Sequence, residues 1–162
     1  KACAAHIFYK DSIMMSQGLY REEKRDSTWI FYNVKGIKVS TENYKLGVKH
    51  GASTVFYASG TVYEQVTWKD GDKIGAWKQF FDSGNKKVEG NYIDDKLDGW
   101  TKFYNVNGKV SHEGLYRKNV KDGPWNHYDD DGKLAIQQRY HMGQLKNKKE
   151  VSAYIQKKRE EK

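Results

Sequence analysis

Residues 99–116 read Gly99-Trp-Thr-Lys-Phe-Tyr-Asn-Val-Asn-Gly-Lys-Val-Ser-His-Glu-Gly-Leu-Tyr116. The run from Trp100 to Tyr104 is rich in aromatic residues and is typical of a β-strand. It is followed by a turn sequence, 105–108, whose last residue is a glycine that can adopt a positive φ. Residues 109–116 form a second run with mixed alternation of polar and apolar side chains. This stretch therefore predicts two antiparallel strands joined by a tight turn.

The same pattern returns along the chain every 24 residues, without insertion or deletion. One column of the repeat is aromatic: Tyr20, Tyr44, Trp68, Tyr92, Tyr116 and Tyr140. A second column holds the turn glycines: Gly36, Gly60, Gly84, Gly108 and Gly132. Four residues before each of these stands another aromatic: Tyr32, Phe56, Phe80, Tyr104 and Tyr128. A further column contains Ser27, Gly51, Gly75, Gly99 and Gly123. A fixed period of this length indicates a repeat architecture.

The period predicts an all-β fold, an elongated single-layer antiparallel meander of 24-residue β-hairpin repeats with a short C-terminal helix. A helix within a unit would need ten or more residues without glycine, and no unit provides them. The links between hairpins, such as 69–75, also have the composition of turns. Strands should hold more than half of residues 20–140, well above the average for globular proteins. The two aromatic columns are predicted to stack as a core ladder.

Three segments follow from the period. Residues 1–19 are expected to form an N-terminal half repeat or cap, residues 20–145 five hairpin repeats, and residues 146–162 a basic C-terminal helix or tail. Asn147 with Glu150 resembles a capping box, and Val151, Tyr154 and Ile155 fall on one helical face. A basic amphipathic membrane helix is the alternative, but its apolar face is narrow and lacks Trp and Phe.

The formal net charge of +8 would attract anionic partners. The tail from Lys146 to Lys162 alone carries seven Lys or Arg and three Glu, and the remaining charges are interleaved with acidic residues. This distribution indicates a mostly solvated surface and no dedicated electrostatic groove, so nucleic acid is not expected as a partner, whereas an anionic membrane surface stays open for the tail. No apolar run approaches the ~18 residues of a membrane helix.

Residues able to carry out catalysis do not form a recognisable motif. The five histidines occupy five different columns of the repeat and lack metal-ligand spacing: His6, His50, His112, His127 and His141. Residues 129–132, Asp-Asp-Asp-Gly, lack the full spacing of a calcium loop and suit a turn. Cys3, the single cysteine, has no evident base partner. We therefore expect no catalytic residue, metal, cofactor or small-molecule substrate.

The tryptophans are the candidate binding residues. Trp77 and Trp125 stand three residues before the strand-end aromatic and so fall on the opposite pleat from it, whereas Trp100 stands four before Tyr104 and shares its pleat. Either a bulge realigns the indoles into a core, which we favour, or the sheet carries indoles on both faces. An exposed aromatic stripe flanked by lysines would suit a peptide or glycan. The candidate site is Trp77, Trp100, Lys102 and Trp125.

The pattern G-x-W-x-x-[FY]…G…E-G-x-Y, as in residues 75–92, resembles the MORN-repeat variant family, which includes bacterial YwqK-type antitoxin-like proteins. The resemblance covers roughly residues 8–145. Ser27 replaces a glycine, Ser53 stands where other units have Trp, and the Trp of the fourth unit moves one place to Trp100. The resemblance implies an extended meander, a role in protein or membrane association, and no catalytic residues.

Together these observations predict a non-enzymatic scaffold that binds a protein through a face or edge of the sheet. Membrane or polyanion association through the tail, and an antitoxin-like role, are the alternatives. The chain starts at Lys1 instead of Met, and bacterial relatives of this type are often exported. We therefore expect an extracytoplasmic bacterial protein, periplasmic, outer-membrane-associated or secreted, whose gene encodes a cleavable apolar segment upstream. A cytoplasmic location is the alternative, and whether Cys3 is lipidated stays open.

Overall fold

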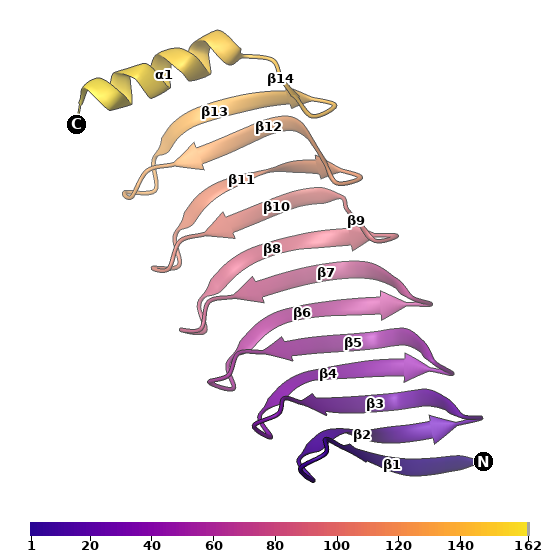
Figure 1. The fold of residues 1–162 in the computed structure, drawn as a ribbon. Helices are drawn as coiled ribbons and strands as arrows, with labels where there is room; N and C mark the ends of the chain where they lie inside the picture. Colours follow the sequence, from indigo (N-terminus) through magenta and orange to yellow (C-terminus); the bar gives the residue numbers. More distant parts are fainter. Residues whose placement is uncertain (162) are drawn as a thin grey trace.

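The computed structural model describes residues 1–161 as one antiparallel sheet followed by a helix (Figure 1). The strands are β1 Ala2–Phe8, β2 Met14–Arg21, β3 Lys24–Tyr32, β4 Lys38–Lys45, β5 Val48–Phe56, β6 Val62–Lys69, β7 Asp72–Phe80, β8 Lys86–Ile93, β9 Lys96–Leu97, β10 Gly99–Tyr104, β11 Val110–Arg117, β12 Val120–Tyr128, β13 Leu134–His141 and β14 Gln144–Leu145, and the helix is α1 Lys148–Glu160. Strands that follow one another in sequence pair, except that β8 pairs with both β9 and β10, and strands make up 63% of the chain. The predicted meander is confirmed.

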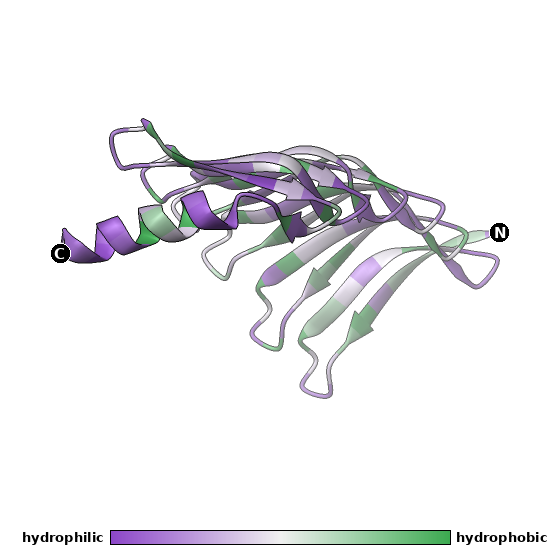
Figure 2. Ribbon diagram, turned by 90° about the horizontal axis from the view of Figure 1, so that it is seen from above, coloured by the Kyte–Doolittle hydropathy of each residue, from purple (hydrophilic) through white to green (hydrophobic). Residues whose placement is uncertain are grey.

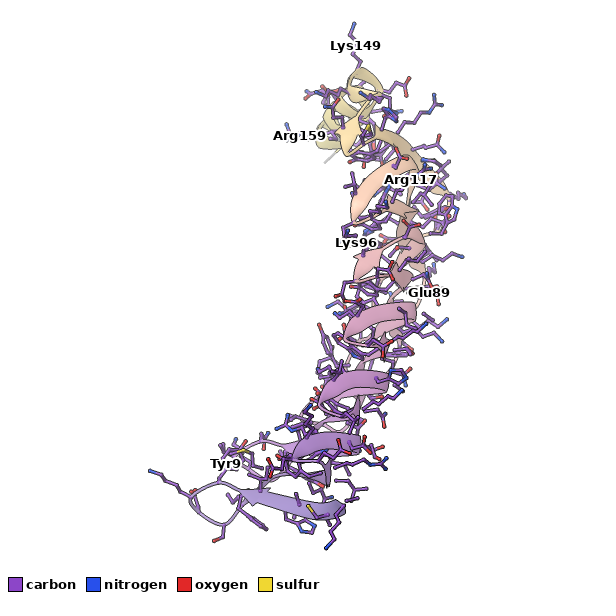
Figure 3. The ribbon with its side chains drawn as sticks, turned by 90° about the vertical axis from the view of Figure 1, so that its right-hand side faces the viewer. Tyr9, Glu89, Lys96, Arg117, Lys149 and Arg159 are labelled. Atoms are coloured by element: carbon purple, nitrogen blue, oxygen red, sulfur yellow. The ribbon has the colours of Figure 1, made fainter. Side chains whose placement is uncertain are left out.

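The sheet is a single layer. Seen from its side it is one strand thick, with side chains projecting from both surfaces (Figure 3). Hydrophobic and hydrophilic residues are interspersed along the strands, and among the described residues no second sheet covers either face (Figure 2). The termini lie at opposite ends of the array (Figure 1). Each hairpin can therefore bury its side chains only against its neighbours, as expected for a repeat protein.

The turns predicted at the periodic glycines are confirmed. In the turn after β7, the Gly84 amide donates to the carbonyl of Phe81, and the Phe81 amide donates to the carbonyl of Asn85. Gly84 has a φ of +87°, which a glycine adopts without steric strain. In the equivalent turn after β10, the Asn105 carboxamide oxygen accepts the amides of residues 107 and 109. Local side-chain chemistry therefore closes this end of each hairpin.

The links at the other end of the hairpins are shorter than the composition of residues 69–75 suggests. Only Asp70 and Gly71 form the turn, and Asp72 already belongs to β7. Both turn residues have positive φ, 52° and 98°, which defines a type I′ turn. The twist of a type I′ turn matches the twist of paired antiparallel strands. The two strands therefore continue up to the turn, and the polar residues on either side of it belong to β6 and β7.

The repeat column that holds Ser27 and the glycines of the later units marks an irregularity in the strand pairing. Gln65 of β6 lies opposite Lys78 of β7, but Thr67 lies opposite Ile74, so one residue of β6 faces three of β7. Gly75 occupies this irregularity with a φ of +67°. Because the bulge shifts the alternation of β7, it decides which face each later side chain of the strand joins.

Side chains also connect successive repeats at the type I′ turns. The Asp26 carboxylate accepts the amide of Leu46, 3.2 Å away, and Asp122 accepts the amide of Met142 at the same distance. In each case the acceptor belongs to one repeat and the donor to the turn of the next. Register is therefore held by interactions between units as well as by the strand ladder.

The C-terminal helix is present, but its predicted capping box is wrong. Asn147 occupies the cap position without bonding the helix amides. Its carboxamide oxygen accepts the amide of Arg139, and its nitrogen donates to the carbonyl of Gln137 and to Glu150. Asn147 thus pairs with the outer edge of β13. Of the three apolar residues expected on one face, Val151 is buried whereas Ile155 is 45% exposed.

Candidate functional site on two unlike faces of the sheet

The bulges place the tryptophans of three units on one side, which we call the tryptophan face: Trp29, Trp77 and Trp125. Trp125 lies against Gly114 of the preceding strand, where an added Cβ would stand 2.2 Å from the indole ring. Its indole nitrogen donates to the Leu115 carbonyl. The side chain is 1% exposed. A glycine in one hairpin therefore leaves the space that the indole of the next hairpin fills.

The candidate site residues do not form one stripe. Trp77 and Trp125 are buried on the tryptophan face, whereas Trp100 is 49% exposed on the opposite side, which we call the polar face. Lys102, two residues along β10, shares that face. The buried position over Gly90 is taken instead by Thr101, which is 0% exposed. The favoured core reading is correct for Trp77 and Trp125, and the alternative of an indole on the other face is correct for Trp100.

Trp100 borders a shallow depression of about 260 Å³ on the polar face. Ala76, Lys78, Asn91 and Lys102 contribute to its lining. The positions equivalent to Trp100 in the other units carry small or compact side chains: Thr28, Ala52, Ala76 and Pro124. Unit four is therefore the place where the polar face gains an indole.

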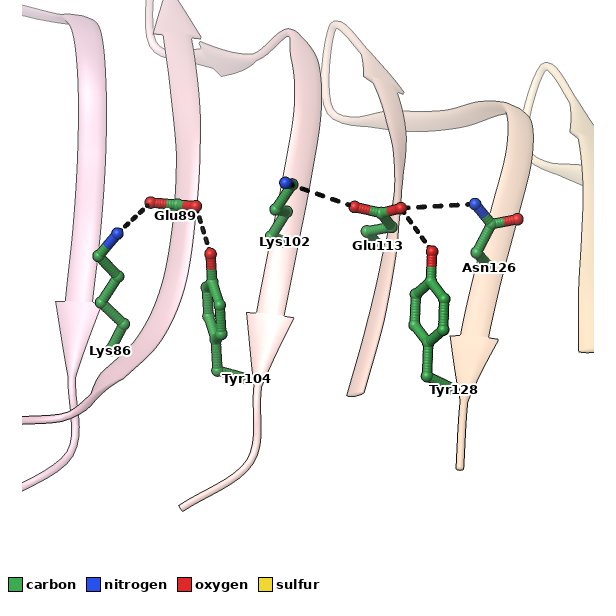
Figure 4. Close-up of polar contacts among 7 residues, drawn as sticks. All are labelled: Lys86, Glu89, Lys102, Tyr104, Glu113, Asn126 and Tyr128. Carbon is green, nitrogen blue, oxygen red and sulfur yellow. Dashed lines mark hydrogen bonds and ion pairs between the residues drawn. The ribbon is translucent and has the colours of Figure 1, made fainter. Parts of the chain in front are cut away.

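Carboxylates on the polar face are held in a repeated polar network (Figure 4). Glu89 accepts hydrogen bonds from Lys86, at 3.0 Å, and from the hydroxyl of Tyr104. One repeat later, Glu113 accepts the hydroxyl of Tyr128 at 2.7 Å, and Lys102 approaches Glu113 to 3.8 Å.

The network holds its tyrosines as donors. Burial, with the hydrogen bond to Glu89, raises the pKa of Tyr104 to about 12. The same hydrogen bond, with one from Lys86, lowers the pKa of Glu89. At neutral pH Tyr104 is therefore a neutral donor and Glu89 a carboxylate. Such a pair orders the surface and has no group poised for proton transfer near neutrality.

Aromatic and basic side chains alternate in a row across the tryptophan face, which we call the aromatic–cation ladder. In order across the sheet it consists of Tyr20, Arg25, Tyr44, Lys49, Trp68, Lys73, Tyr92, Leu97, Tyr116, Lys121 and Tyr140. All of these side chains are half-buried. Leu97, in unit four, interrupts the basic residues.

The cations of the ladder lie over aromatic rings. The ammonium of Lys73 lies 5.4 Å from the ring centre of Trp68 and 5.2 Å from that of Tyr92. The ammonium of Lys121 lies 3.9 Å from the Trp125 ring, and burial lowers the pKa of Lys121. Sequence reasoning identified the aromatic column but missed the cations. Their signal was available, because they recur at the same 24-residue interval: Arg25, Lys49, Lys73 and Lys121.

We searched the described residues for groups that could bind a metal ion or transfer a proton. Among residues 1–161 no group of three or more His, Cys, Asp or Glu side chains is placed to hold a metal ion. His112 and His127 stack with ring centres 5.3 Å apart, and burial, with the proximity of His127, lowers the pKa of His112. The described helix is not long and apolar enough to cross a membrane.

Three hairpins, residues 49–70, 73–94 and 121–142, match the family model for the MORN repeat variant. These three hairpins are MORN repeats of the variant type. Each matched segment spans one hairpin of the sheet, from β5 to β6, β7 to β8 and β12 to β13. MORN repeats generally bind proteins or membranes and are generally non-catalytic. Comparison with curated proteins gives no significant match. The YwqK-type subtype stays a prediction.

Proposed function

We propose that this protein is a non-enzymatic scaffold that binds a partner protein through the polar face, with Trp100 as the anchor. The observation that carries the proposal is the exchange in unit four, which buries Thr101 and exposes an indole beside Lys78 and Lys102. The Trp100 side chain is 49% exposed, so about half of its surface is open to a partner. Tryptophan is among the residues that most often dominate the binding energy of protein interfaces.

The sheet around Trp100 is suited to binding without rearrangement. The carboxylates beside Lys102 are already engaged by tyrosines and lysines, and the strand is paired on both sides. A partner would therefore meet a preorganised surface and would lose little free energy in ordering it.

The test compares partner capture by the wild-type chain and by Trp100→Ala, using cross-linking in the source organism followed by affinity measurement with the purified partner. Trp100→Ala should weaken binding by at least about tenfold, as expected for an anchoring residue. Leu134→Ala, which removes a side chain that is 55% exposed on β13, serves as the matched control and should bind normally. Absence of any reproducible partner, or equal affinity of both variants, would refute the proposal.

A second candidate function is association with an anionic surface through the C-terminal helix. Its last turn presents Lys157, Lys158 and Arg159, while Asn147 and Val151 hold its first turn on the sheet. Replacing the basic residues of the last turn with Gln should abolish binding to anionic vesicles, and wild-type binding should fall steeply with salt. Binding that persists at high salt would exclude this function.

A further inference from the structure

We propose that the aromatic–cation ladder is a second binding surface, for an acidic partner segment in the polyproline II conformation that carries a carboxylate at every third residue. The surface lies on the tryptophan face, so the proposal is independent of Trp100. It is argued from the charge of the ladder, its free hydrogen-bond donors and its spacing.

Three of the four ladder cations form no ion pair within residues 1–161. Lys49 pairs with Glu42 at 3.1 Å, but no ion pair engages Arg25, Lys73 or Lys121. Each of these three is held in place by the rings beneath it. The rings order the cations but do not neutralise them. An external carboxylate would therefore find charges that are already positioned.

The aromatic members add unused donors. The hydroxyl of Tyr44 donates to Glu42, whereas those of Tyr92 and Tyr116 make no hydrogen bond within the described chain. Burial raises the pKa of Tyr92 and of Tyr116, so both hydroxyls stay protonated near neutrality. A polyproline II peptide has no internal hydrogen bonds, and its carbonyls are free to accept from them. Aromatic-lined surfaces are a known means of recognising this conformation.

The spacing of the ladder selects the conformation. Neighbouring strands lie about 4.8 Å apart and each repeat contributes two, so successive cations stand about 9.6 Å apart. Polyproline II rises about 3.1 Å per residue with three residues per turn, which brings every third side chain to the same side after about 9.3 Å. An extended β-strand alternates sides with a period of two and would turn its third residue away. DNA phosphates, about 3.4 Å apart along each strand, are far denser than the cations.

The run of cations also sets the length of the segment. Arg25, Lys49 and Lys73 stand in consecutive repeats, and Leu97 ends the run. A segment with three carboxylates at three-residue intervals matches this run, with its outer carboxylates on Arg25 and Lys73 and its middle one sharing Lys49 with Glu42. A fourth carboxylate at the same interval would meet Leu97 and should add little affinity.

The experiment measures fluorescence anisotropy of a labelled peptide in which Glu stands at every third position and Pro at the others. A second peptide of the same composition has its Glu residues at every fourth position. The first should bind at least about tenfold more tightly, because it alone can place several carboxylates on the ladder. Equal affinity of the two peptides would overturn the proposal. So would equally tight binding of duplex DNA or anionic vesicles, which would indicate general attraction of polyanions.

Variants locate the surface. Lys73→Gln should weaken peptide binding about tenfold and reduce its salt dependence, whereas Lys78→Gln, on the polar face of the same strand, should do neither. Thermal unfolding establishes that both variants stay folded. Trp100→Ala should bind the peptide normally, which separates this proposal from the proposed function. An unchanged affinity of Lys73→Gln, or an equal loss with Lys78→Gln, would contradict it.

Discussion

Units four and five use the same hairpin geometry in different ways. In unit five, Trp125 of β12 lies flat against Gly114 and is 1% exposed. In unit four, Thr101 of β10 lies against Gly90, and the indole stands one residue earlier on the opposite face, 49% exposed. Both units have a glycine with a positive φ at the same position, Gly123 inside β12 and Gly99 at the start of β10. The two units therefore share the glycine but differ in their side chains, and the strand that is continuous in unit five, β12, is divided into β9 and β10 in unit four.

The comparison shows what the glycine of the preceding strand provides. Gly114 leaves room for the large, rigid indole of Trp125, whose nitrogen also donates to a backbone carbonyl. Gly90 lies against the smaller side chain of Thr101, whose buried hydroxyl has no hydrogen-bond partner in the described chain. Unit five gains a well-packed core, whereas unit four gives up part of its core and exposes an indole. The predictions below test whether this contrast sets stability.

The largest effect is expected when the space for Trp125 is closed. Gly114→Ala places a Cβ 2.2 Å from a rigid indole and should cost about 3 kcal/mol, as for severe overpacking. Gly90→Ala brings a Cβ within 2.9 Å of the Thr101 hydroxyl, a small side chain that can rotate, and should cost about 1 kcal/mol. Urea unfolding of both variants measures the difference. Similar losses would mean that the indole does not set the requirement for glycine.

Removing the indoles tests the comparison from the other side. Trp125→Ala should destabilise the chain by about 3–5 kcal/mol, because a fully buried aromatic is deleted. Trp100→Ala should change stability by no more than about 0.5 kcal/mol, as for surface substitutions. Denaturant midpoints of the two variants give the values. A large loss for Trp100→Ala would assign that indole a structural role and weaken the proposed function.

The aromatic ladder should be most sensitive away from the ends of the array. Tyr116 packs edge-on against Trp125 and has complete hairpins on both sides. Tyr116→Ala should cost about 3 kcal/mol. Tyr20 makes a similar contact with Trp29 but lies in the first hairpin, so Tyr20→Ala should cost less. Equal losses in urea unfolding would contradict the nearest-neighbour description of stability.

The smallest effect concerns pH. Burial lowers the pKa of His112 below its usual 6.5. As the pH falls, the His112 imidazole is therefore protonated at a higher pH in the unfolded chain than in the folded chain. Its contribution to stability is therefore complete above about pH 6.5 and is lost as the pH falls through the lower folded value. His112→Val copies Val88, the equivalent residue of the preceding hairpin, and should flatten the pH dependence of the unfolding free energy in this range. If the unfolding free energy of His112→Val depends on pH as steeply as that of the wild type, His112 does not contribute to this pH dependence.

The 24-residue period was sufficient to predict the hairpins, the single-layer meander and the glycine turns, and the spacing of Val151, Tyr154 and Ile155 predicted the C-terminal helix. These features depend on residues close in sequence, such as Asn105 and Gly108 in one turn, and on a spacing that no other regular structure accommodates. The tryptophans of the candidate site were also found from the repeat: Trp77 and Trp125 share one column, and Trp100 stands one residue away from it. Structure that depends on neighbouring residues could be predicted because the same residues recur in each unit.

What only the tertiary structure decided was the face on which each side chain lies. A bulge at Gly75 or Gly99 shifts the alternation of a strand, and its size is apparent only from the register against the preceding strand. That shift buries Trp77, exposes Trp100 and aligns Lys73 with Trp68 and Tyr92. Asn147, likewise, bonds the edge of β13 instead of its own helix because that edge lies beside it in space. Contacts between strands depend on register, which the spacing of residues along one strand does not specify.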